Sequence, residues 1–195
     1  MAEQVETIIV GGGQSGLAMS HWLRHEGREH LILEQHGIAD RWQSQRWDSL
    51  CLLTPNWTVT LPSYQYDGPD PNGFMGKDEL HGILTAYAER IAAPAHVPPA
   101  WPDPPELTDP ILQLDLRAAG VTSIIWATGF RYAFDWIRLP VLDAEGNPRH
   151  QRGITEFPGL YFLGLRWLYK FKSSFIHGVG DDAEYLAEHI TATAR

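Results

Sequence analysis

Three glycines and one glutamate carry the clearest chemical signal in this chain. Gly11, Gly13 and Gly16 form the pattern G-x-G-x-x-G directly after an apolar run, and Glu34 ends a second apolar run. The first glycine permits a tight turn, the second lets the backbone approach a pyrophosphate, and the third allows close helix–strand packing. An acid at that distance accepts hydrogen bonds from a ribose. The pattern predicts an ADP-binding βαβ unit, with a glycine-rich turn that binds nothing as the plainer alternative.

The elements around these residues follow from local patterning. Residues 7–10 and 30–33 are expected to be strands, and the helix between them is expected to end at Gly27. Its N-terminus would supply unpaired N–H groups and the positive end of a dipole to an anion. A second amphipathic helix is predicted after Asp78 as its cap and runs to residue 91, with apolar residues at i, i+3, i+4 and i+7.

Composition excludes several classes of function. The 195 residues carry a formal net charge of −9, which offers no basic face for a general nucleic-acid binder. No apolar run is long enough to cross a membrane, and the acidic N-terminus does not resemble an export signal. The single cysteine, Cys51, cannot form an intramolecular disulfide, so a cytoplasmic location is expected. We interpret Cys51 as a small buried hydrophobic residue, with a catalytic thiol as the alternative.

The rest of the chain alternates between irregular and regular stretches. Residues 37–77 are rich in turn formers yet contain three tryptophans, which indicates an irregular segment that packs over a ligand or over the core. Seven prolines between residues 94 and 110 predict an extended connector. The sequence then predicts a short helix over 109–119, strands over 121–126 and 160–164, and a last helix over about 178–190. A further strand at residues 95–97 is an open possibility.

Together these features resemble the flavin-containing monooxygenases and their bacterial relatives. The matching stretches are I-I-V-G-G-G-Q-S-G-L-A and L-I-L-E near the N-terminus, R-W at 41–42, W-D-S-L-C-L-L-T-P at 47–55, W-A-T-G-F at 126–130, P-G-L-Y-F-L-G at 158–164 and S-S-F-I-H-G-V-G-D-D-A at 173–183. The order of these motifs makes the resemblance specific, and it covers about four-fifths of the chain. It implies that the first βαβ unit holds FAD.

The resemblance also implies a set of cofactor-binding residues. Trp42, Leu53 and Thr54 would line the flavin side with Asn56 nearby, and the flavin pyrimidine end would face Gly164 and the helix start at Gly178 and Val179, whose N–H groups stabilise negative charge. The full expected set is Gly11, Gly13, Gln14, Ser15, Gly16, Glu34, Gln35, Arg41, Trp42, Leu53, Thr54, Asn56, Thr128, Gly129, Gly164, Gly178 and Val179. No metal ligands are expected.

One departure from the family pattern decides the expected architecture. The family inserts an NADPH-binding domain with its own glycine fingerprint, whereas residues 92–128 contain a single glycine, Gly120. We therefore expect an α/β fold: a Rossmann-like FAD-binding domain in three layers around a central parallel sheet, with a short Pro-rich linker in place of the NADPH domain. The single domain would span 1–195, with a first half at 1–93, the linker at 94–110 and a second half at 111–195. Loop closure over so short a linker is plausible because its entropic cost grows slowly with length.

Three functions remain open from the sequence. The first is a minimal FAD-binding flavoprotein without autonomous NADPH-dependent turnover. The second is an oxidoreductase component that a separate donor reduces and that oxidises a small substrate or oxygen. The third is a non-catalytic binding module. FAD is the expected partner, without nucleic acid or membrane, and the surface left by the missing domain offers a route to self-association.

Several side chains have a chemical and a plainer interpretation. His177 is either an acid/base group near the flavin or a packing residue. His21 and His25 have helical spacing for zinc but lack further ligands, which favours surface histidines. Residues 170–172 are interpreted as a solvated basic–aromatic rim.

Overall fold

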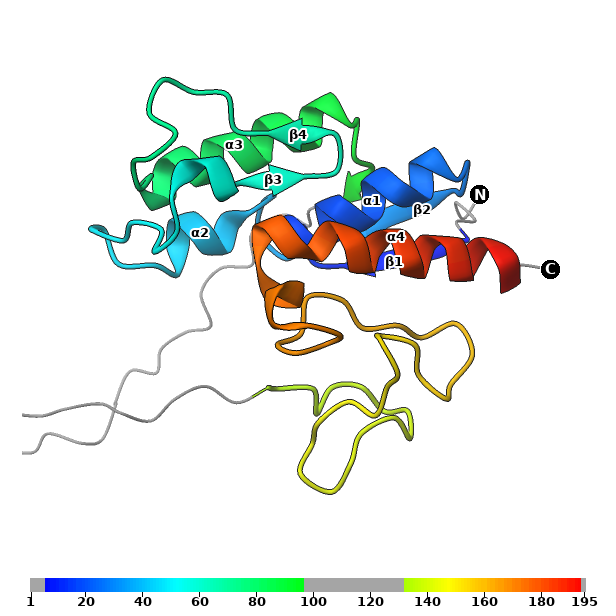
Figure 1. Ribbon diagram of the computed structural model, residues 1–195. Helices are drawn as coiled ribbons and strands as arrows, with labels where there is room; N and C mark the ends of the chain where they lie inside the picture. Colours follow the sequence, from blue (N-terminus) through cyan, green and yellow to red (C-terminus); the bar gives the residue numbers. More distant parts are fainter. Residues whose placement is uncertain (1–5, 97–131, 194–195) are drawn as a thin grey trace, which may run out of the picture.

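A parallel βαβ unit opens the fold. The computed structural model describes residues 6–96 and 132–193. In it, strand β1 (Thr7–Val10) leads into helix α1 (Gln14–His25), and strand β2 (His30–Leu33) returns parallel to β1 with Thr7 opposite His30 and Val10 opposite Leu33. Figure 1 shows α1 lying beside the two strands. The predicted strand–helix–strand order is confirmed.

Helix α1 ends where the sequence predicts. The N–H of Gly27 donates to Arg24 O at 3.0 Å, and the N–H of Arg28 donates to Leu23 O at 2.8 Å. This pair of hydrogen bonds is the Schellman arrangement, which satisfies the last carbonyl groups of the helix. The turn directs the chain back into β2.

A third strand extends the sheet. Strand β5 (Ala95–His96) pairs parallel with β2, so the strand order among the described residues is β1-β2-β5. The strand considered at 95–97 is therefore present at its first two residues, whereas Val97 lies outside the described residues. Helix α3 (Lys77–Arg90) connects to this strand and packs Leu80, Leu84 and Tyr87 into the core.

The start of α3 differs from the expected cap. The helix begins at Lys77 with Gly76 in the N-cap position, and no side chain caps it. Asp78 instead lies in the first turn, where a carboxylate still interacts favourably with the helix dipole. The expectation that Asp78 is the cap was wrong because Lys77 is already helical and Gly76, with an extended backbone, takes the N-cap position.

Residues 37–77 form a mostly irregular layer with short elements. It contains helix α2 (Asp40–Ser44), the 3-10 helix η1 (Asn56–Thr58) and an antiparallel hairpin of strands β3 (Thr60–Leu61) and β4 (Tyr64–Gln65). Of the three tryptophans expected to pack, only Trp42 does, whereas Trp47 and Trp57 are exposed. Cys51 is also exposed, which corrects its interpretation as a buried residue.

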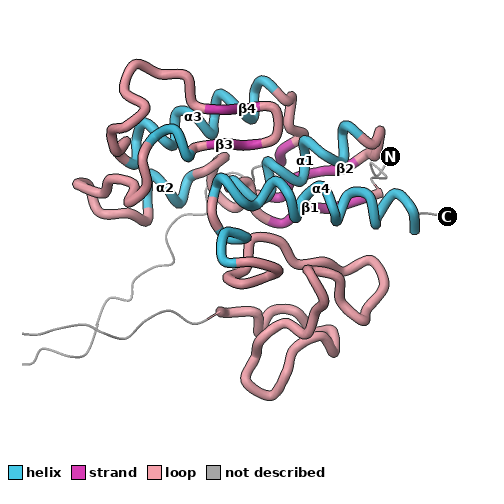
Figure 2. Tube along the Cα trace, viewed as in Figure 1, coloured by secondary structure: helices cyan, strands magenta, loops and turns pink. Residues whose placement is uncertain are grey.

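The C-terminal part of the chain is loop followed by one long helix. Helix α4 (Ile176–Thr193) follows the 3-10 helix η2 (Phe171–Ser174) and packs along α1, and Figure 2 shows that the segment before them is almost entirely loop. The strand predicted at 160–164 is not formed. Only Tyr161 makes a bridge, to Ile154, because the neighbouring chain turns at Arg152 and Gly153 with positive φ angles of 48° and 87°.

Three helices enclose the main core. Buried apolar residues of α1, α3 and α4 meet there with Ile9 and Ile32 of the sheet, and a smaller cluster forms around Phe162 in the loop segment. Within the described ranges, no helix is long and apolar enough to cross a membrane. The helix predicted at 109–119, the strand at 121–126 and most of the Pro-rich linker lie outside the described residues.

Candidate functional site

The fingerprint glycines bring β1, α1 and the turn between them into close contact. Gly11 has φ +105°, a conformation that side chains rarely adopt, and its N–H donates to Leu33 O at 2.8 Å. A Cβ on Gly16 would overlap the carbonyl oxygen of Gly11 and lie 3.3 Å from Ile9 Cγ2. Helix α1 can therefore approach β1 this closely only with glycine at position 16.

The N-terminus of α1 is open toward the outside of the turn. Gly13 is the N-cap residue, no side chain caps the helix, and a Cβ on Gly13 would meet nothing within 4 Å. The first intrahelical hydrogen bond runs from Leu17 N to Gly13 O, and no acidic residue lies in the first turn. The N–H groups that precede Leu17 in the helix, together with the helix dipole, form a site suited to an anion such as a pyrophosphate.

Glu34 reaches back to this turn from the end of β2. Its Oε2 accepts the N–H of Gly12 at 2.6 Å, and its Oε1 accepts the N–H of Gln35 at 2.7 Å. An ionised carboxylate has about four acceptor positions, so two remain for hydroxyl donors. Glu34 thus holds the fingerprint turn in place and keeps acceptor capacity beside it. Gln35 itself is exposed.

Helix α2 connects the fingerprint to the expected flavin side. Trp42 is half-buried and donates its Nε1–H to Gln14 Oε1 at 3.3 Å, which links α2 to the first turn of α1. The N–H of Ala39 donates to Gly12 O at 3.0 Å at the start of the same helix. Arg41 is exposed on α2. Trp42 and Gln14, 28 residues apart, are therefore neighbours at the site.

The segment after α2 places its expected residues in different environments. Leu53 is 95% exposed, an unusual state for a large apolar side chain, whereas Thr54 is half-buried and accepts a hydrogen bond from Thr58 at 3.0 Å. Asn56 is buried, with Oδ1 accepting the N–H of Met75 and Nδ2 donating to Asp70 O. The structure thus gives the Asn56 side chain a role in organising this loop, and its expected contact with a cofactor stays a prediction.

Gly164 lies against the fingerprint helix. Its φ is +77°, and a Cβ there would overlap Ser15 Oγ. Helix α4 begins at Ile176, two residues before the expected start, so the N–H groups of Gly178 and Val179 both donate to Phe175 O at 3.0 Å. The expectation that these two residues present free N–H groups was wrong, because the helix has already begun there. Thr128 and Gly129 lie outside the described residues.

His177 and His21 are partly buried, whereas His25 is exposed. Burial, together with the nearby Lys172 cation, lowers the pKa of His177, although Asp181 opposes this, and the imidazole packs against Phe175. His21 stacks on Tyr87, and burial is the main cause of its lowered pKa. In residues 6–96 and 132–193, no three His, Cys, Asp or Glu side chains are grouped to hold a metal. Lys170 and Lys172 both pair with Asp181, beside an exposed Phe171.

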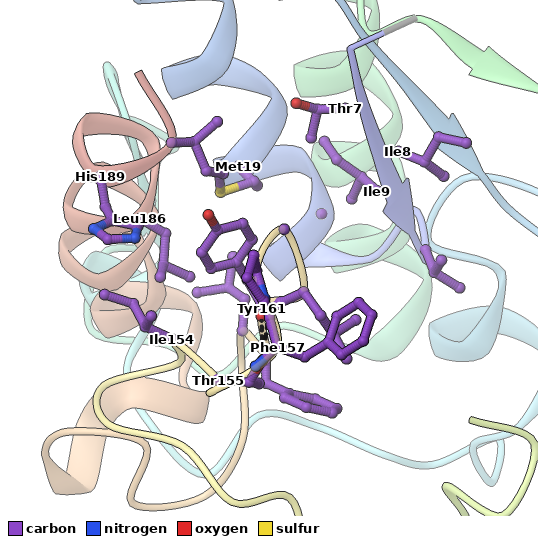
Figure 3. A pocket seen from close by; sticks show the side chains of 18 of the residues that line it. Thr7, Ile8, Ile9, Met19, Ile154, Thr155, Phe157, Tyr161, Leu186 and His189 are labelled. Carbon is purple, nitrogen blue, oxygen red and sulfur yellow. Dashed lines mark hydrogen bonds between the residues drawn. The ribbon is translucent and has the colours of Figure 1, made fainter. Parts of the chain in front are cut away.

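A groove of about 740 Å³ runs beside β1. Figure 3 shows Ile8 and Ile9 of β1, Met19 of α1 and Leu186 of α4 around it, with Tyr161 from the loop segment. Among the expected cofactor-binding residues that the structure describes, only Ser15 and Gly16 line this groove. The groove is mainly apolar, and its lining includes neither Gly11, Gly12 and Gly13 nor Glu34, so we place the candidate site at the turn.

Sequence reasoning missed one participant at the fingerprint. Gly12 donates to Glu34, accepts from Ala39, and would bring a Cβ within 2.7 Å of Ile38 Cδ1. The run of three consecutive glycines at 11–13 is the signal that could have identified it.

Comparisons with known proteins find similar oxidoreductases and a flavin monooxygenase. No family model matches the chain. It is similar to a CzcO-like oxidoreductase of Geobacillus kaustophilus, at 24% identity over 347 residues that cover 97% of this chain and 99% of the relative. It is also similar to the oxidoreductase CzcO of Bacillus subtilis, at 46% identity over 193 residues, 94% of this chain and 52% of the relative. The chain thus spans about half the length of the Bacillus relative.

A solved structure gives the fold independently. The flavin-containing monooxygenase of Stenotrophomonas maltophilia matches with a TM-score of 0.74 and 16% identity, over 98% of this chain and 99% of that one. At that identity the likeness concerns the fold alone. The described α/β core with its parallel sheet is therefore similar to a flavin monooxygenase fold.

Proposed function

Because this chain belongs to the flavoprotein oxidoreductases that resemble flavin-containing monooxygenases, we propose that it is a minimal FAD-binding flavoprotein. FAD is its cofactor, and the fingerprint turn holds the ADP half. The observation that carries the proposal is the open, uncapped N-terminus of α1 at Gly13, with Glu34 brought to the same turn.

The residues present fit the two halves of FAD. A pyrophosphate would take the free N–H groups at the start of α1, and ribose hydroxyls would donate to the remaining acceptor positions of Glu34. On the flavin side, the exposed Leu53 offers an apolar surface and Trp42 an aromatic one. When bound, FAD supplies the redox chemistry, and the described side chains bind and orient it.

We further propose that the NADPH-binding domain of the family is missing, so that the chain is one FAD domain joined by the linker at 94–110. The alignment to the Geobacillus relative supports this, because it runs over 347 residues whereas this chain has 195. A large block of the relative has no counterpart here. Autonomous NADPH-dependent turnover would then be lost.

A second candidate function is a component reduced by a separate donor protein. The observation that favours it is a run of exposed aromatic residues, Trp167, Tyr169 and Phe171, which a partner could cover. Stopped-flow reduction with and without candidate reductases separates the two functions.

FAD titration of the purified protein tests the main proposal. We expect one FAD per chain by visible absorbance, tight binding of FAD, competition by ADP, and poor binding of FMN, which lacks the ADP half. Glu34→Gln should weaken FAD binding because an amide nitrogen cannot accept a hydrogen bond. Glu188→Gln, an exposed change on α4, serves as the control. Equal affinity for FMN and FAD, or an unaffected Glu34→Gln variant, would contradict the proposal.

A further inference from the structure

Lys77 occupies a position that is unfavourable for its charge. It is the first residue of α3, where the helix dipole is positive, and its side chain is only 10% exposed. Burial and the dipole both disfavour an ammonium group there. A lysine at this place therefore needs a specific partner that compensates.

The principal partner belongs to α2. Lys77 Nζ donates to Gln43 O at 3.0 Å, whereas the nearest oxygens of Asp48 and Asp78 lie 3.6 Å away on exposed side chains. At that distance each carboxylate contributes little, because both are exposed and water screens their charge. The partly buried hydrogen bond to the Gln43 carbonyl is thus the main interaction, and it joins the start of α3 to α2.

Helix α2 depends on such external contacts. It has five residues, none of them buried, and it starts from Ala39 at φ +58° without a side-chain cap. A helix this short is not stable by itself in water. What holds it is the set of contacts to its neighbours: Ala39 N to Gly12 O, Trp42 to Gln14, and Lys77 to Gln43.

We propose that Lys77 is a positioning residue for the flavin side of the cofactor site: its ammonium group fixes α2 so that Trp42 stays against Gln14. This inference rests on the proposed FAD binding. Lys77 bonds α2 at Gln43, at the end of the helix away from the hydrogen bond between Ala39 and Gly12, so its loss should affect mainly the part of FAD beyond the ADP half. The ADP half depends on Gly13, Gly16 and Glu34, which Lys77 does not contact.

The test compares the affinities of FAD and ADP in matched variants of the full chain. Lys77→Met keeps an unbranched side chain of nearly the same length but removes the donor. We expect FAD binding to weaken about tenfold, the effect of losing one charged hydrogen bond. ADP affinity, measured by calorimetry, should stay within about twofold. Lys77→Arg should restore most of the FAD affinity, and Asp48→Asn, on an exposed side chain, should match the wild type.

A double-mutant cycle with Trp42→Phe provides a second readout. Phenylalanine keeps a ring but cannot donate to Gln14. If Lys77 acts through Trp42, the double variant should lose no more FAD affinity than the weaker-binding single variant. Additive losses would overturn the proposed route. If Lys77→Met does not fold by circular dichroism, Lys77→Gln takes its place in both experiments.

The outcomes separate this inference from the proposed function. A wild-type protein that binds neither FAD nor ADP contradicts the FAD proposal itself. A wild type that binds both, with an unchanged Lys77→Met variant, overturns the role of Lys77. Equal weakening of FAD and ADP also overturns it, because that result indicates a general loss of structure.

Discussion

Alanine at positions 13 and 16 should separate the folding role of the fingerprint from its binding role. The Cβ of Gly16→Ala would overlap Gly11 O and lie 3.1 Å from Gly11 C, both backbone atoms that cannot move as a side chain tip can. Overpacking costs about 1–3 kcal/mol, and rigid neighbours favour the upper end of that range. Alanine regains about 1 kcal/mol over glycine within a helix. The free energy of unfolding should therefore fall by about 2 kcal/mol.

Gly13→Ala should behave in the opposite way. Its φ of −82° suits alanine and its Cβ would meet nothing within 4 Å, so the protein should unfold at nearly the same denaturant concentration. The weaker N-cap and the smaller entropy of the unfolded chain each contribute less than about 1 kcal/mol with opposite signs. FAD affinity should nevertheless fall more than tenfold, since about 1.4 kcal/mol of overlap with the pyrophosphate is sufficient.

Urea unfolding of the apo-protein and FAD titration measure the two effects. Gly16→Ala should lower the urea midpoint by about 1 M for an m-value of about 2 kcal/mol/M. The control is Gly82→Ala, in the middle of α3 with open space around its Cβ, which should stabilise the protein by up to about 1 kcal/mol. The reasoning is refuted if Gly16→Ala is as stable as the wild type, or if Gly13→Ala binds FAD with unchanged affinity.

Three further predictions concern reduction, pH and packing. NADPH should reduce bound flavin far more slowly than dithionite, because oriented hydride transfer requires a nicotinamide site; fast saturable reduction in stopped flow would contradict this. Burial lowers the pKa of His21 and His177, so the unfolded chain binds their protons first, and the free energy of unfolding should fall as the pH drops below 6.5 and level off above it. A urea midpoint that does not decrease as the pH is lowered from 7.5 to 5.5 would contradict this role of the two histidines. Tyr87→Phe removes the hydrogen bond to Pro62 O and should destabilise the protein by about 1–3 kcal/mol in urea unfolding, and a neutral result would show that this carbonyl finds another donor.

The sequence alone determined the elements that depend on local patterning. The βαβ unit, the end of α1 at Gly27 and the extent of α3 to within about a turn all follow from apolar periodicity and glycine placement. Glu34 could be assigned to the fingerprint turn because parallel strands end at the same edge of a sheet. These features depend mainly on contacts between residues that are close in the sequence.

Only the tertiary structure decided the features that depend on distant partners. Residues 160–164 have the composition of a strand, but their neighbour turns at Arg152 and supports a single bridge. Gly164 lies against Ser15, although most of the sequence separates them, and Lys77 bonds α2. Neither contact has a local signature, because a buried hydrogen bond or a close approach depends on how remote segments pack, whereas periodicity records only which face of an element is apolar.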